Sequence, residues 1–158
     1  MSSIRFLWIL AASLTAASCA LSKAEKLSAY DVLQEYGFPV GLLPKGALGY
    51  ALNRETGEFA VYFDGTCSFE IESYTLKYKS TITGVISNGR LSNLKGVSVK
   101  ILILWLDIVE VTLKDNHLYF SVGIASADFE VENFIESPQC GCGFNCNKLL
   151  LNGDVSSI

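Results

Sequence analysis

Three kinds of residue in this chain could do chemistry: one histidine, alternating carboxylates and a set of cysteines. His117 is the only histidine, and it follows Asp115-Asn116 at an expected hairpin turn. A Ser-His-acid triad would need this imidazole beside an activated serine in a pocket. The chain has no Gly-x-Ser-x-Gly elbow that would present such a serine. We therefore expect His117 to be a half-exposed surface residue, and we expect no catalytic residue.

Carboxylates alternate along two expected strands. Glu70 and Glu72 would share one face, and Asp128, Glu130 and Glu132 would share another. Paired carboxylates can cleave glycosidic bonds, but the same spacing is typical of the solvated face of a half-buried sheet. We expect the solvated face. No glycine-rich nucleotide-binding spacing is present, so we expect no cofactor.

The cysteines favour disulfides. Cys67 stands alone, whereas Cys140, Cys142 and Cys146 lie close together. Bridge geometry disfavours a Cys140–Cys142 bond across one residue, so one of these three should reach Cys67; two pairings remain open. A zinc site would need a second ligand pair at short spacing, and the distant candidates are only Cys67 and His117. We expect two disulfides and no metal.

The first twenty residues have the pattern of a cleaved signal peptide. Arg5 precedes the apolar run 6–12, and Ser18-Cys19-Ala20 places small side chains at a cleavage site; cleavage after Ala24 is the alternative. The apolar run is too short for a transmembrane anchor. Cleavage after Ala20 removes Cys19 and leaves an even number of cysteines. We expect a secreted protein in the apoplast, with the vacuole as the alternative, where disulfides persist.

Length and charge limit the remaining classes. The 158 residues suit one domain, which we place at 28–146 before a flexible tail at 147–158. Hydrophobic residues make up 50% of the chain, enough for a packed core. The net charge of −4 argues against nucleic acid as a partner.

One helix is predicted near the start of this domain. Ser28 can cap it, with Asp31 as a capping-box partner. Gly37 suits the left-handed residue that ends a helix, and Pro39 prevents its continuation. The apolar stretch 38–46 reads as an ordered loop packed on the core.

From residue 48 onward, apolar residues alternate with polar ones. The expected strands are centred on Phe59-Val61-Phe63, Cys67-Phe69-Ile71, Tyr74-Leu76-Tyr78, Ile82-Gly84-Ile86, Val109-Val111-Leu113, Leu118-Phe120-Val122-Ile124 and Phe129-Val131. Turn residues separate strands at short intervals, which is typical of antiparallel sheets. We expect a β-rich α+β domain: a single antiparallel barrel-like sheet with one N-terminal helix, stapled by disulfides.

The segment 97–106 differs, because beyond Lys100 it is apolar on both faces. We expect one strand, which either is central and covered on both faces or lines a cavity. In either case we expect it to be paired with neighbouring strands and shielded from solvent. A small barrel can keep a cavity for one apolar ligand. The candidate lining residues are Phe59, Phe63, Phe69, Leu104, Trp105 and Phe120.

Ordered segments across the chain resemble the plant-specific family catalogued as domain of unknown function 538. The matching segments are 30–33, 37–44, 59–63, 74–78, 84–87 with Leu91, 96–97, 104–106, 122–123, 126–129 and 137–140. The resemblance implies a compact β-rich domain with a helix, related to the lipid-binding fold of bactericidal/permeability-increasing proteins. Proposals for the family include lipid or lipopolysaccharide binding, a chlorophyll-related esterase activity, and roles in the stress response or development.

Residues and resemblance together favour a non-enzymatic secreted module that binds a lipid or another apolar small molecule. The alternative is an apoplastic interaction or structural protein with a solid core. A weak esterase-type hydrolase is the second alternative, and it rests on the resemblance alone.

Overall fold

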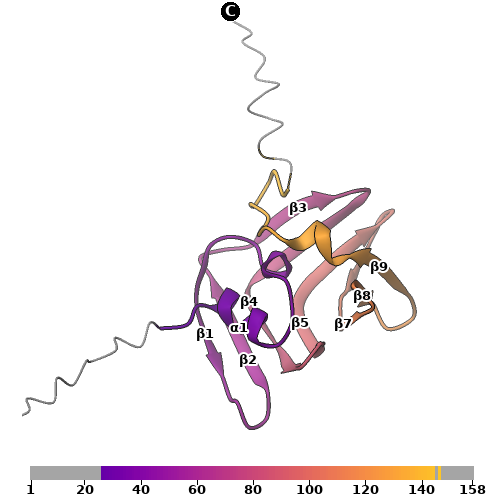
Figure 1. The fold of residues 1–158 in the computed structure, drawn as a ribbon. Coiled ribbons are helices and arrows are strands. Elements are labelled where there is room, and N and C mark those ends of the chain that lie inside the picture. Colours follow the sequence, from indigo (N-terminus) through magenta and orange to yellow (C-terminus); the bar gives the residue numbers. More distant parts are fainter. Residues whose placement is uncertain (1–25, 145, 147–158) are drawn as a thin grey trace, which may run out of the picture.

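The computed structural model describes residues 26–144 and 146, which form one β-sheet with short helices (Figure 1). Helix α1 (Ala29–Glu35) and the 3-10 helix η1 (Val40–Leu42) precede the sheet, and the 3-10 helix η2 (Val131–Phe134) follows it. The strands are β1 (Ala47–Leu52), β2 (Glu58–Phe63), β3 (Cys67–Ile71), β4 (Tyr74–Ser87), β5 (Arg90–Ile101), β6 (Leu104–Asp107), β7 (Glu110–Lys114), β8 (His117–Ser121) and β9 (Ser126–Glu130).

The predicted leader (1–20) and tail (147–158) lie outside the described residues. Over 26–144 and 146, no helix is both long enough and apolar enough to cross a membrane.

Helix α1 begins and ends where the sequence predicts. The Asp31 N–H donates to the Ser28 hydroxyl at 3.2 Å, and the Asp31 carboxylate accepts from the Ser28 N–H at 2.7 Å. This reciprocal pair is a capping box, which satisfies N–H groups left free at a helix start. Gly37 follows the helix with a φ of +87°, a conformation that glycine adopts without steric cost. The predicted helix is confirmed.

The loop after α1 packs on the core, as expected. Phe38, Leu42 and Leu43 are buried in the same apolar cluster as the inner side chains of the sheet. The buried Tyr78 hydroxyl donates to the Leu42 carbonyl at 2.9 Å and so ties η1 to β4.

All strand pairs are antiparallel, and the sheet is built on two long strands. Its hydrogen-bonded order is β1-β2-β4-β5-β7-β8-β9. Strand β4 pairs with β3 along its first half and with β2 along its second, whereas β5 pairs with β7 near its start and β6 near its end. Two expected strands, around Leu76 and Gly84, are therefore parts of one continuous β4.

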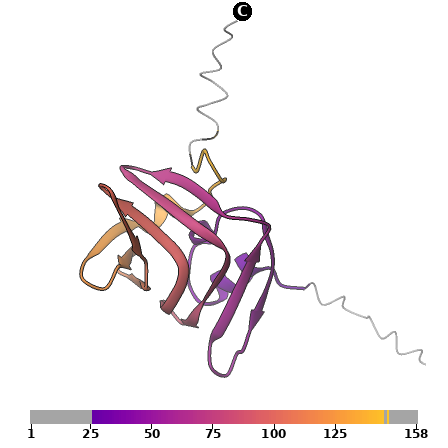
Figure 2. The same cartoon turned by 180° about the vertical axis from the view of Figure 1, so that it is seen from behind.

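The β4–β5 ladder is irregular in the middle, where the register shifts between Tyr78 and Thr83 and again before Val85. Gly96 lies across from this region with a φ of +100°, and a Cβ on it would stand 2.6 Å from the Thr81 carbonyl oxygen. Such irregularities bend strands and increase twist. Figures 1 and 2 show the resulting curved sheet from both sides.

The sheet is open. Its path ends at β1 and β9, and no ladder among the described strands joins these two edges. Residues of α1, η1 and η2, including Leu33, Leu42 and Phe134, share one buried cluster with the sheet's inner face. The fold is thus a mostly antiparallel sheet with one α-helix and disulfides, and closure into a barrel is absent from the strand order.

The prediction of one covered strand through 97–106 is wrong. Strand β5 ends at Ile101, Leu102 and Ile103 form a two-residue turn, and β6 returns from Leu104. The side chains of Leu102 and Ile103 are 91% and 86% exposed. The segment contains no Gly, Pro, Asn or Asp at this turn, so apolar continuity concealed the reversal.

One disulfide holds the C-terminal segment against the sheet, and a second closes a short loop within that segment. Cys67 bonds Cys140 across 73 residues, and Cys142 bonds Cys146. The Gly141 N–H also donates to the Ser68 carbonyl at 2.7 Å, beside the first bridge. The prediction of two bridges, one of them reaching Cys67, is confirmed, and the structure selects between the two pairings left open.

Candidate apolar binding site

A cavity of about 220 Å³ opens at one end of the sheet; we call it the aromatic cavity. It lies between the β3–β4 and β5–β6 end of the sheet and the final strands β8 and β9. Its lining residues are Ile71, Tyr74, Leu76, Val99, Ile101, Ile108, Phe120, Val122, Ala125, Ser126, Ala127, Phe129 and Phe134. The volume exceeds the roughly 150 Å³ of an engineered apolar cavity that holds benzene.

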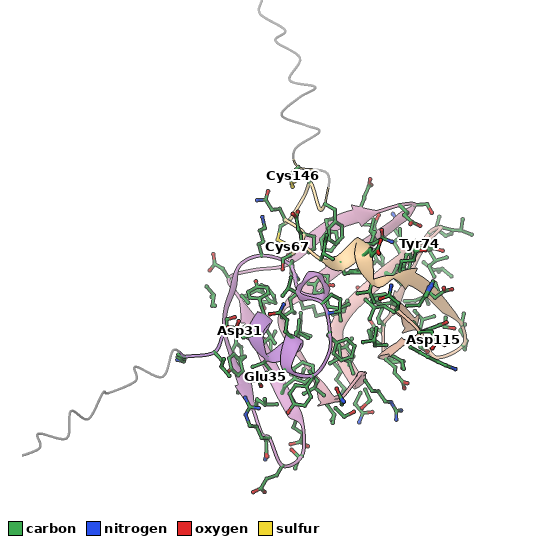
Figure 3. All side chains as sticks on the ribbon, in the orientation of Figure 1. Asp31, Glu35, Cys67, Tyr74, Asp115 and Cys146 are labelled. Atoms are coloured by element: carbon green, nitrogen blue, oxygen red, sulfur yellow. A yellow bond between two sulfur atoms is a disulfide. The ribbon has the colours of Figure 1, made fainter. Side chains whose placement is uncertain are left out.

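Strand alternation and aromatic packing build the wall of this cavity. The Phe129 ring meets Tyr74 edge-on with centroids 6.0 Å apart, and it meets Phe120 at 5.7 Å. Phe134 of η2 completes the group at 6.3 Å from Phe129. Edge-to-face pairs at these distances are favourable beyond simple burial. In Figure 3, Tyr74 lies on the side of the molecule away from α1, where Asp31 and Glu35 are labelled.

The lining is chemically simple. Its only polar side chains are the Tyr74 and Ser126 hydroxyls. Apart from the hydrogen-bonded hydroxyl of Tyr78, no charged or other polar side chain among the described residues is buried in the core. Because an unpaired buried charge costs several kcal/mol or more, a ligand's charged group would stay at the mouth. The aromatic cavity therefore suits the apolar part of an amphiphile.

Apolar residues continue outward from the cavity. Leu102 and Ile103 directly follow the lining residue Ile101. Ile124 stands between the lining residues Val122 and Ala125, and its side chain is 91% exposed. The rim is thus apolar on two separate loops, where polar turn residues would be usual.

A second cavity, of about 60 Å³, lies under α1, and its only polar side chains are those of Tyr50 and Tyr78. Ile108 and Phe120 line both cavities and form a shared wall. This volume is well below the roughly 150 Å³ of an engineered apolar cavity that holds benzene, so the second cavity is too small for a ring. Burial in this region raises the pKa of the Tyr78 hydroxyl above its usual value.

The structure separates the four phenylalanines chosen from the sequence. Phe120 lines both cavities and Phe59 lines the small one. Phe63 is buried elsewhere in the core. Phe69 stacks on Tyr78 with centroids 5.8 Å apart, beneath the C-terminal segment.

The other two candidates lie outside the aromatic cavity. Leu104 is 62% exposed at the start of β6. Trp105, 46% exposed, lies on the outer face of the sheet. Lys77 and Lys100 place their ammonium groups 5.7 and 6.0 Å from its ring centroid. Such lysines are attracted to the face of the indole ring.

Sequence reasoning missed much of the actual lining. Ala125, Ser126 and Ala127 are small, and small residues give no signal for a cavity wall. Phe134 belongs to a 3-10 helix outside any periodic pattern. Ile71 lies on an expected strand, and its alternation with polar neighbours could have been used to select it.

The single histidine is paired at the surface. His117 Nδ1 lies 3.0 Å from a carboxylate oxygen of Asp128 on the neighbouring strand, and its side chain is 36% exposed. Neither residue lines the aromatic cavity. This arrangement is a cross-strand pair of the kind that stabilises sheets, in the half-exposed position expected from the sequence.

The carboxylates do not converge on the cavity. Glu70 is exposed on β3, while Glu72 lies in the β3–β4 turn with a φ of +52° and so leaves the strand alternation. Glu110 accepts a hydrogen bond from Arg90 at 3.2 Å, which lowers the pKa of that carboxyl. Within 26–144 and 146, no three His, Cys, Asp or Glu side chains cluster in a way that could hold a metal ion.

Comparisons with known proteins give a family and one distant relative. The family model described as "Protein of unknown function, DUF538" matches residues 29–135. An uncharacterized protein of Arabidopsis thaliana is 28% identical over 95 residues, which are 60% of this chain and 55% of the relative. The chain thus spans about half the length of that relative.

Proposed function

We propose that this chain, which belongs to the DUF538 family, is a secreted, non-enzymatic module that binds the apolar part of a lipid or another small molecule. The aromatic cavity carries the proposal: it measures about 220 Å³, and its polar side chains are two hydroxyls. Ligand sites are commonly apolar clefts with few polar groups. The curved sheet acts as a half-open, barrel-like cup, with the mouth at the β5–β6 turn.

Cavity size constrains the ligand. Sites for complete drug-sized ligands usually measure about 300–1,000 Å³, so this cavity suits a ring or part of one acyl chain. The remainder of an amphiphile would lie across the rim at Ile101 and Val122. Secretion is part of the proposal, because two disulfides and a leader-like N-terminus fit an oxidising compartment.

Native and denaturing mass spectrometry of the protein secreted from plant cells is the first test. A native mass that exceeds the disulfide-bonded polypeptide by a dissociable adduct would support the binding module. A bare mass, together with no heat of binding on titration with dodecanoate, would favour the interaction protein with a solid core.

A cavity-filling substitution makes the test specific. Ala127→Leu places extra apolar volume in the aromatic cavity and should weaken dodecanoate binding about tenfold or more. Each methylene of ligand displaced costs about 0.8 kcal/mol, and 1.4 kcal/mol is tenfold in affinity. Ala51→Leu makes the same change at an exposed site on β1 and should bind like the wild type. Equal affinity in both variants would place the ligand elsewhere.

A further inference from the structure

Exposed apolar side chains gather at the cavity end of the sheet. We define the apolar tip as Leu102, Ile103 and Leu104 of the β5–β6 hairpin together with Ile124 of the β8–β9 loop. These side chains are 91%, 86%, 62% and 91% exposed, respectively. The β5–β6 and β3–β4 turns lie side by side at this end in both views of the ribbon (Figures 1 and 2).

The hairpin turn is also unfavourable as a local structure. Leu102 has a φ of +57° in a two-residue turn. Glycine is preferred at the first central position of such a turn when that φ is positive. At another two-residue turn with positive φ, this chain uses Asp115 and Asn116, which tolerate the left-handed region. A bulky apolar residue here costs free energy in water, and the fold gains no core packing from it.

The residues around the apolar tip indicate the chemistry of its partner. Trp105 stands directly behind the tip with Lys77 and Lys100 over its ring. Tryptophan and lysine are typical of the part of a membrane-binding protein that contacts the lipid headgroups, while neighbouring apolar side chains insert into the acyl-chain region. Glu70 and Asp107 occupy the same outer face, so the charges behind the tip are of both signs.

From these observations we infer that the apolar tip inserts into a zwitterionic phospholipid bilayer. Mixed charges complement phosphate and choline together, and an overall negative chain gains little from anionic lipid. Two separated, protruding loops suit a soft, laterally continuous apolar phase better than a rigid protein groove. The inference goes beyond the proposed function, since insertion does not require a ligand in the cavity.

The test is flotation of the secreted protein with phosphatidylcholine vesicles. The wild type should float with the vesicles, whereas the double variant Leu102→Gly with Ile103→Ser should partition at least about tenfold less, because two apolar side chains no longer insert. The variant should remain folded, since Gly-Ser suits the turn. Leu48→Asn is the matched control: it removes a 71% exposed apolar side chain from β1, and it should float like the wild type.

Spectroscopy and salt give independent readouts. Trp105 is the only tryptophan after residue 8, so its emission should shift to the blue when the secreted protein binds vesicles. Because insertion is apolar, 0.5 M NaCl or added phosphatidylserine should change partitioning by less than about twofold, unlike screened charge attraction.

Several outcomes would overturn the inference. Failure of the wild type to float, or equal flotation of the tip variant, would do so. So would wild-type dimers that the tip variant converts to monomers in analytical ultracentrifugation, since the tip would then cover a second copy. Ala127→Leu should still float, so loss of dodecanoate binding in that variant and loss of flotation in the tip variant test the two proposals separately.

Discussion

The buried hydroxyl of Tyr78 shows how one polar atom can fix the position of a loop. Its hydrogen bond to the Leu42 carbonyl, at 2.9 Å, joins β4 to η1 across 36 residues of chain. Buried polar groups need such partners because an unmatched one keeps its full desolvation cost. The pattern of apolar residues placed Tyr78 on an inward strand face, but it could not indicate which carbonyl the hydroxyl meets.

Tyr78→Phe should lower the free energy of unfolding by about 1–2 kcal/mol, because it leaves the Leu42 carbonyl without its donor. Urea unfolding at pH 7 measures the loss. Tyr62→Phe, at a 42% exposed site, is the control and should change stability little. A similar loss in both variants would contradict a specific role for the buried hydrogen bond.

The same hydroxyl should make stability sensitive to alkali. Burial raises the pKa of Tyr78 in the folded protein, whereas a tyrosine in the unfolded chain ionises near pH 10. The folded state therefore retains a proton that the unfolded state releases, and stability should fall as pH rises above about 10. Tyr78→Phe should reduce this fall, as measured by urea unfolding between pH 8 and pH 11. An unchanged alkaline slope would reject the mechanism.

At the scale of elements, α1 is specified locally. Its capping box uses Ser28 and Asp31, and its end uses Gly37, all within a few residues of the helix. Local hydrogen bonds and backbone preferences depend on residues that are adjacent in the sequence. Both ends of this helix could therefore be predicted.

Asp31 should make that helix sensitive to acid. Hydrogen bonds from the Ser28 side chain and backbone lower the pKa of Asp31 in the folded protein. The unfolded state then binds the proton more readily, so the contribution is present above the unfolded pKa near 3.8 and is lost as pH falls below it. The stability difference between the wild type and Asp31→Asn should therefore hold from pH 7 to 5 and shrink below about pH 4.

Urea unfolding from pH 7 to pH 2.5 measures this difference. Ser28→Ala removes the hydroxyl donor and should itself reduce the acid dependence that Asp31 supplies. A wild-type profile that runs parallel to the Asp31→Asn profile throughout would refute the assignment.

The β5–β6 hairpin is the element that sequence patterns could not resolve. Its turn at Leu102-Ile103 lacks the residues that normally announce a reversal, so Val97–Leu106 reads as one apolar strand. The pairing of β5 with β6 shows the chain reversal: Lys100 lies opposite Trp105, and Ile101 lies opposite Leu104. The turn combines a positive φ at Leu102 with two apolar side chains exposed to water, and both cost free energy. This cost is the reason to test for an apolar partner at this site.

At the scale of the molecule, the Cys67–Cys140 bridge connects β3 to the C-terminal segment. It closes a loop across 73 residues, whereas Cys142–Cys146 spans a separation of four. Replacing the first pair by serine should lower the free energy of unfolding by about 4 kcal/mol, and replacing the second pair by about 2 kcal/mol, on the chain-entropy account. Chemical denaturation under non-reducing conditions compares the two variants. A larger loss from the short bridge would contradict the loop-length argument.

The sequence by itself determined the local features: the capped helix, strand alternation, the four cysteines that form two disulfides, and the family. These features depend on residues close together in the chain, or on composition, so they can be predicted without knowledge of long-range contacts. Tertiary structure alone decided that the sheet stays open from β1 to β9, and that Phe120, Phe129 and Phe134 meet around one cavity. It also left Leu102 and Ile103 in water. Hydrophobicity marks a residue as one that burial would favour, but only the paths of distant strands determine whether it is buried, lines a cavity or remains exposed.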